Sequence, residues 1–143
     1  MARTLTPRQK RNKNTIQQLE AAGFYVYELH PWRVQLVVHL LEDFDAIRDI
    51  LPDLEDGRPY GASFQPYSAH DNWDLAVVSV KMDADPAIVA GRVAHEAIHT
   101  LNSIFKSRGQ EWDLDNDEYQ AYAIEMIVVR TLWGIERMIK HGA

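Results

Sequence analysis

Residues 91–105, which read GRVAHEAIHTLNSIF, contain the motif on which the interpretation of this chain depends. His95 and His99 are four positions apart, and Glu96 directly follows the first of them. On an α-helix, side chains four residues apart lie on one face, so both imidazoles would point to the same place. Two histidines at this spacing, with a glutamate beside the first, are typical of a metal-binding helix. The motif therefore predicts His95 and His99 as metal ligands and Glu96 as a general base.

The flanking sequence favours a helix around this motif. Asp85 and Pro86 are typical of a helix N-cap and first helical position, and Gly109 is a plausible stop. One apolar row recurs at helical spacing: Val89, Val93, Ala97 and Leu101. Polar residues share another flank: Arg92, His95, His99 and Asn102. This pattern predicts a largely buried helix with the histidines along one polar side.

A catalytic zinc site needs a third protein ligand and an open coordination position. A second helix is predicted to start near residue 117, and Glu118 lies in its first turn, nineteen residues after His99. Residues 109–116 are long enough to turn the chain back, so we expect Glu118 to approach the histidine pair. Asp117 and Glu125 are the alternative ligands. In another interpretation, Glu118 only complements the dipole at the start of its helix.

Two segments together resemble a known superfamily. VAHEAIHTLN at 93–102, followed by DEYQAYAIEMI at 117–127, resembles the zincin metallopeptidases of the gluzincin type, and also short metallopeptidase-like proteins of bacteriophages and prokaryotes. The resemblance covers residues 73–132. It implies bound Zn²⁺ with these residues in these roles: His95, His99 and Glu118 as ligands, and Glu96 as the general base and acid. The H-x-x-G-x-x-H extension of metzincins does not follow the motif. Asp117-Glu118 stands where larger gluzincins carry Asn-Glu. These differences affect what the resemblance implies about the substrate class more than what it implies about metal binding.

Two further side chains near the motif have alternative roles. Tyr122, one turn after Glu118, would stabilise an oxyanion as a catalytic residue, or would instead be a core tyrosine with its hydroxyl at the rim. Arg92, one turn before His95, would support a ligand or hold a substrate carboxylate. Its alternative is a salt bridge to the acidic segment 111–118.

Composition limits the functions that this chain can have. With 143 residues, 46% of them hydrophobic, it is expected to form one domain. It has no cysteine, so any metal must be held by nitrogen and oxygen. There is no apolar signal region or membrane span, which makes a cytoplasmic location the expectation, the host cytoplasm for a phage protein. The net charge of −6 argues against a general nucleic-acid-binding role.

The order of predicted elements indicates an α+β fold, a minimal zincin-like domain with a small, mostly antiparallel sheet packed against the motif helix and a C-terminal helix. We expect a basic N-terminal helix in 1–23, a sheet region in 24–82 and the metal-site helices in 85–140. The basic residues of the first part are either a solvated helix start or a contact for nucleic acid or an acidic partner. Strands are predicted at 24–29, 34–40 and 73–82, a short helix at 43–51, and a loop or irregular hairpin at 52–68. The strand at 73–82 or the one at 24–29 is expected to offer an edge to an extended peptide.

The function expected from these features is zinc-dependent hydrolysis of a peptide or amide bond in a peptide or protein substrate. The alternative is a non-catalytic protein that keeps the scaffold and captures a cellular partner. Neither the substrate nor the oligomeric state has a signature in the sequence.

Overall fold

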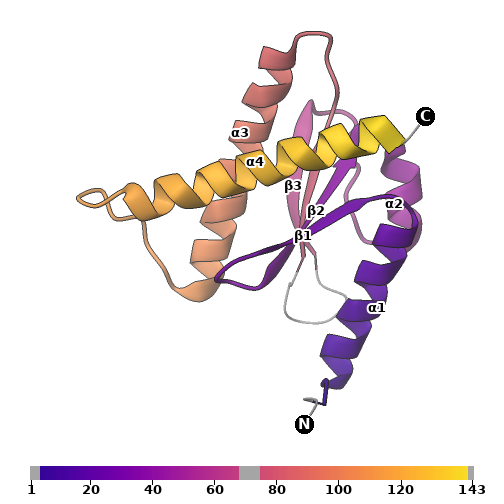
Figure 1. Ribbon diagram of the computed structural model, residues 1–143, viewed down its shortest axis with the longest axis horizontal. Helices are drawn as coiled ribbons and strands as arrows, with labels where there is room; N and C mark the ends of the chain where they lie inside the picture. Colours follow the sequence, from indigo (N-terminus) through magenta and orange to yellow (C-terminus); the bar gives the residue numbers. More distant parts are fainter. Residues whose placement is uncertain (1–3, 68–74, 142–143) are drawn as a thin grey trace.

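The computed structural model describes residues 4–67 and 75–141 and confirms an α+β fold (Figure 1). The elements follow one another as α1 (Pro7–Ala21), β1 (Tyr25–Leu29), β2 (Val34–Leu40), the 3₁₀ turn η1 (Leu41–Asp43), α2 (Phe44–Ile50), β3 (Ala62–Tyr67), β4 (Leu75–Val80), α3 (Pro86–Arg108) and α4 (Glu118–His141). Among the described residues, none of the helices combines the length and the apolar character that a membrane span needs.

The four strands form one sheet in the order β1-β2-β4-β3. The outer pairs β1/β2 and β3/β4 are antiparallel, as expected for most of the sheet, and the central pair β2/β4 is parallel. The prediction that the 73–82 strand offers a free edge is wrong, because β4 lies between two neighbours and all six of its residues are buried. Residues 73 and 74 of that prediction lie outside the described part.

The predicted loop at 52–68 is also partly wrong, because it contains the edge strand β3. Proline has no N–H to donate to a ladder, so Pro66 reads as a strand breaker in the sequence. At an edge, however, one side of a strand needs no donors, and Pro66 is tolerated there. The edge strands of the described sheet are β1 and β3. The alternative prediction, that the strand at 24–29 lies at an edge, is confirmed by β1.

Helices cover both faces of the sheet. Tyr25 and Tyr27 of β1 face α4: a Cβ added to Gly134 would lie 2.6 Å from the Tyr25 ring, and Arg130 Cζ lies 3.8 Å from the centre of the Tyr27 ring. His39 of β2 points to the opposite face, where its ring meets the ring of Phe44 at the start of α2. The sheet thus separates two apolar layers, with α3 and α4 on one side. Figure 1 shows α4 crossing α3 steeply.

The motif helix α3 begins and ends where the sequence predicts. The Asp85 carboxylate accepts a hydrogen bond from the Ala87 N–H at 2.9 Å, and Pro86 occupies the first helical position. Gly109 ends the helix in the left-handed region with φ of 66°, which glycine adopts without strain. The predicted apolar row is buried against the sheet: Val89, Val93, Ala97 and Leu101. Burial of this row fixes which side of α3 remains exposed.

An aromatic cluster fixes the turn from α3 to α4. The rings of Phe105 and Tyr119 stack with centres 6.1 Å apart, and Trp32 packs edge-on against both. Trp112 Nε1 donates to Asn102 Oδ1 at 2.6 Å, and Trp32 Nε1 donates to Gln110 Oε1 at 2.9 Å. These contacts join the connection between the helices to the C-terminal half of α3.

Candidate functional site

The two motif histidines converge on the exposed flank of α3. His95 Nε2 and His99 Nε2 are 3.2 Å apart, and the ring centres are separated by 4.9 Å. Nitrogen ligands at about 2.0–2.1 Å from a tetrahedral zinc ion lie roughly 3.3–3.4 Å from each other. The spacing of the two nitrogens therefore fits two corners of one metal ion. The imidazoles are also ligands that suit zinc.

Glu96 lies beside this pair but is turned inward. Only 7% of its side chain is exposed, compared with 68% for His95, and its Oε1 is 4.0 Å from His95 Nε2. No described residue donates a hydrogen bond to this carboxylate. Burial raises the pKa of Glu96, while the neighbouring histidines act in the opposite direction. The carboxylate oxygens of Glu96 are not sealed from solvent, because no buried side-chain oxygen of the described residues lacks a partner. A mostly buried carboxylate with a raised pKa is a common feature of functional sites.

An open groove of about 480 Å³ adjoins the pair on the Glu96 side. Its lining comes from the entrance to β3 and from α3: Tyr60, Gly61, Ala62, Gly91, Arg92, His95 and Glu96. We call it the site groove. It places the mostly buried Glu96 and one imidazole beside β3, an edge strand of the described sheet.

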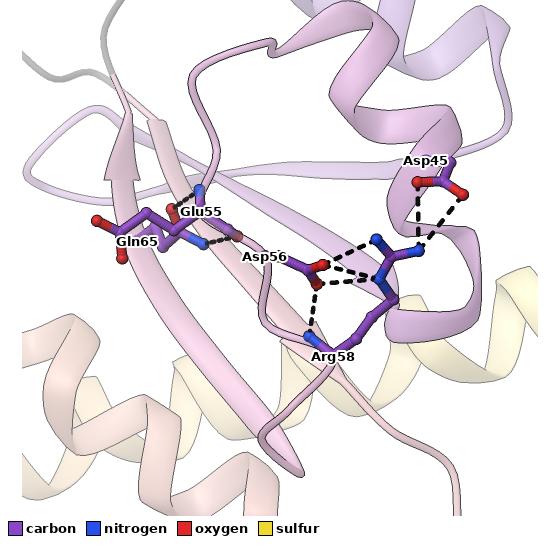
Figure 2. Close-up of polar contacts among 5 residues, drawn as sticks. All are labelled: Asp45, Glu55, Asp56, Arg58 and Gln65. Atoms are coloured by element: carbon purple, nitrogen blue, oxygen red, sulfur yellow. Dashed lines mark hydrogen bonds and ion pairs between the residues drawn. The ribbon is translucent and has the colours of Figure 1, made fainter.

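The wall of the site groove formed by the β3 entrance is held by a polar network (Figure 2). Arg58 lies between Asp56 and Asp45, with Nη2 donating to Asp56 Oδ2 at 2.8 Å and Nη1 to Asp45 Oδ1 at 3.3 Å. The side chain of Gln65 pairs with the backbone N–H and C=O of Glu55, each at 2.8 Å. The segment that leads to Tyr60 and Gly61 is thereby joined to α2 and to β3.

Arg92 of α3 also lines the site groove. Its Nη1 donates to the backbone oxygen of Lys81 at 2.8 Å, and among the described residues it forms no ion pair. The predicted alternative of a salt bridge to the segment 111–118 is therefore wrong. The guanidinium of Arg92 instead bonds Lys81, the residue that follows β4.

The expected third ligand does not join the pair. Glu118 is the first residue of α4 and is exposed. Within residues 4–67 and 75–141, there is no group of three or more His, Asp or Glu side chains that could hold a metal ion. Tyr122 is 66% exposed, so the interpretation as a core tyrosine is wrong.

A second hollow, which sequence reasoning missed, lies where α3 and α4 cross. This apolar pocket has a volume of about 450 Å³ and is lined by Ile98, Trp112, Asp117, Gln120, Ala121, Ile124, Glu125, Val128 and Val129. It contains both alternative ligands, Asp117 and Glu125, but not Glu118. The sequence did hold one signal for this pocket: Ile98 is an apolar residue between the two motif histidines. In the structure 41% of Ile98 is exposed.

The single histidines outside the motif have ordinary surroundings where the structure describes them. His30 is exposed, with Nε2 3.3 Å from Glu28 Oε2. His39 is buried, and its Nδ1–H donates to the Leu40 oxygen at 3.0 Å. Burial lowers the pKa of His39 to about 4. His70 lies outside the described residues.

Comparison of the chain with models of known protein families, with curated proteins and with solved structures gives no match.

Proposed function

We propose that this chain is a metal-dependent hydrolase of peptide or amide bonds, in which His95 and His99 hold Zn²⁺ and Glu96 is the general base. The observation that carries the proposal is the 3.2 Å separation of the two Nε2 atoms beside a buried carboxylate. Two imidazoles in a chain without cysteine favour zinc over metals that need thiolate ligands. The resemblance to zincins supports the same assignment.

Each group of the site has a role in this mechanism. Bound by His95 and His99, Zn²⁺ would supply Lewis-acid chemistry, activating water for attack and polarising the substrate carbonyl. Glu96 accepts a proton from the attacking water and transfers it to the leaving amine nitrogen as the C–N bond breaks. Tyr122 remains the proposed donor to the oxyanion. Burial assists Glu96, because a poorly solvated carboxylate holds the transferred proton more readily.

The third ligand is the part of the proposal that experiment has to decide. Glu118 is the first candidate, and Asp117 and Glu125 are the alternatives. Replacing each by alanine in turn, and measuring bound zinc by mass spectrometry, identifies the ligand as the variant with the largest loss of metal.

The free side of β3 supports an extended peptide as the substrate. The Gly61 oxygen accepts from the Lys81 N–H at 2.9 Å, so this residue pair is hydrogen-bonded. Ladder bonds alternate along an antiparallel pair, so the backbone groups of Ala62 and Phe64 point away from β4. An added strand would pair with them, next to the site groove. The backbone groups of Pro66 also point away from β4, so its missing N–H costs no hydrogen bond within the sheet.

Two variants test the proposal directly. In Glu96→Gln, zinc is expected to stay bound while hydrolysis of a peptide library is lost by about 10²–10⁴-fold, because the general base is absent. In the double variant His95→Ala/His99→Ala, the bound zinc itself is expected to be lost. Unchanged zinc content in the double variant would refute the proposed ligands.

A second candidate function is a non-catalytic protein that captures a cellular partner, favoured by the incomplete ligand set among the described residues. It predicts that Glu96→Gln leaves the biological effect unchanged. The cytoplasmic location and the minor role of nucleic acid stay predictions. Deleting residues 1–14 checks the latter through the salt dependence of binding.

A further inference from the structure

Arg92 is held in a defined position within the site groove. Its Nη1 is fixed by the Lys81 oxygen at 2.8 Å. On its other side lies the backbone of Gly61, and a Cβ added there would come within 2.9 Å of Arg92 Nε. The guanidinium is therefore confined between the end of β4 and the entrance of β3. Glycine at 61 is what leaves the space for it.

Most of the hydrogen-bonding capacity of Arg92 is unused. A guanidinium has five N–H donors in a planar fork, and among the described residues only one bond, to Lys81, is made. Glu96 follows at the i+4 position, where a salt bridge would be common on a helix. No such pair forms, because the carboxylate is turned inward and Arg92 is drawn to the end of β4. Among the described residues Arg92 thus has no acidic partner, and its positive charge lines the groove.

The position of Arg92 relative to the proposed reaction is set by α3. It precedes His95 by three residues, about 4.5 Å along the helix axis. An extended peptide advances about 3.3 Å per residue. Since Arg92, His95 and Glu96 line the same groove, a group held by the Arg92 guanidinium would belong to a residue within a few positions of the scissile carbonyl. The neighbouring Gly91 leaves the approach open, since a Cβ added there would meet nothing within 4 Å.

From this arrangement we propose that Arg92 binds a carboxylate of the peptide substrate and so selects for peptides that carry one close to the scissile bond. The planar fork matches the two oxygens of a carboxylate. Either a free C-terminus or an Asp or Glu side chain supplies this group. The identity of the ligand as a peptide rests on the proposed function, whereas the affinity of Arg92 for a carboxylate does not depend on hydrolysis.

The test is a binding assay on the purified full chain kept free of metal by a chelator, so that hydrolysis does not interfere. Three peptides that carry an uncharged fluorophore share one backbone: an amidated neutral peptide, the same peptide with a free C-terminal carboxylate, and an amidated peptide with one glutamate. Fluorescence anisotropy gives a Kd for each. We expect one or both carboxylate peptides to bind about 10-fold or more tightly than the neutral one, and the tighter of the two identifies the source.

Variants separate recognition by Arg92 from a general effect of charge. Arg92→Gln should abolish the preference, and Arg92→Lys should restore only part of it, because a point charge lacks the fork. Gly61→Ala should reduce the preference without touching the arginine chemically, since its Cβ displaces the guanidinium. Thermal unfolding checks that each variant is folded. Lys106→Gln, an exposed cation near the C-terminal end of α3, is the matched control and should leave the preference unchanged.

Equal Kd values for all three peptides, or a preference that survives in Arg92→Gln, would overturn the inference. Retention of the full preference in Gly61→Ala would overturn the placement of the guanidinium against Gly61. A carboxylate preference in a chain that hydrolyses no peptide would leave Arg92 as the anion-binding residue and refute only the proposed function.

Discussion

Acid should destabilise this protein through His39. The ring is 2% exposed and lies against the rings of Phe24 and Phe44. Burial disfavours the charged imidazolium and lowers the pKa of His39 from 6.5 to about 4. Because the unfolded chain takes up this proton first, the stabilisation is complete above pH 6.5 and is lost as the pH falls toward 4.

The size of the effect follows from the two pKa values. Linkage gives a loss of about 2 kcal/mol in the free energy of unfolding between about pH 7 and about pH 4.5, rising to roughly 3 kcal/mol at lower pH. Other groups also change protonation on acidification, Asp56 and Glu136 mainly toward the lower end of this range and below it. Asp56 and Glu136 have lowered pKa values and act in the same direction, whereas Glu96, with a raised pKa, acts in the opposite one.

A variant isolates the contribution of the histidine. His39→Asn keeps an amide N–H near the place of Nδ1–H, which donates to the Leu40 oxygen, but has no group that titrates. Urea denaturation of both proteins at about pH 7 and about pH 4.5 gives four free energies of unfolding. We expect the wild type to lose about 2 kcal/mol more than the variant on acidification. If both proteins lose the same free energy of unfolding, burial of His39 does not cause the acid sensitivity.

Three further predictions concern α3 and its surroundings. Glu96→Gln should raise the free energy of unfolding of the metal-free protein near neutral pH, because the raised pKa means that ionising this buried carboxylate opposes folding; a lower denaturation midpoint would contradict this. Asp85→Ala removes the side-chain acceptor of the Ala87 N–H and should cost about 1 kcal/mol in chemical denaturation, whereas the same change at the exposed Asp115, whose carboxylate bonds no described residue, should cost less. Leu101→Ala opens a cavity at a fully buried position and should cost about 2–5 kcal/mol, against a near-zero cost for Ile88→Ala at a position that is 44% exposed.

The sequence predicted what is decided locally. Caps, apolar spacing and the stop at Gly109 all act within a few residues, so the bounds of α3 and the convergence of His95 and His99 followed from the pattern. A helix fixes the relation between positions four residues apart without help from the rest of the fold.

What depends on distant partners was not predictable in the same way. β3 was missed because Pro66 is acceptable only at a sheet edge, and the edge exists only once β4 has found its two neighbours. The approach of Glu118 depends on how steeply α4 crosses α3, which is set by packing around Phe105 and Tyr119 rather than by loop length. The conformation of Arg92 required the end of β4 and Gly61, both far from it in sequence.

Pro66 has a further consequence for how molecules of this protein meet. Unpaired strand borders invite self-assembly into fibrils, and proteins counter this hazard with prolines and charges. If two copies of β3 met in opposite directions, the missing donor of Pro66 would interrupt the shared ladder at each end. A short peptide ligand would pair only with the part of β3 near Ala62, so the missing N–H donor of Pro66 would not affect its binding. Pro66 thus leaves room for a bound peptide to pair with β3 near Ala62, and it disfavours self-association of the protein through β3.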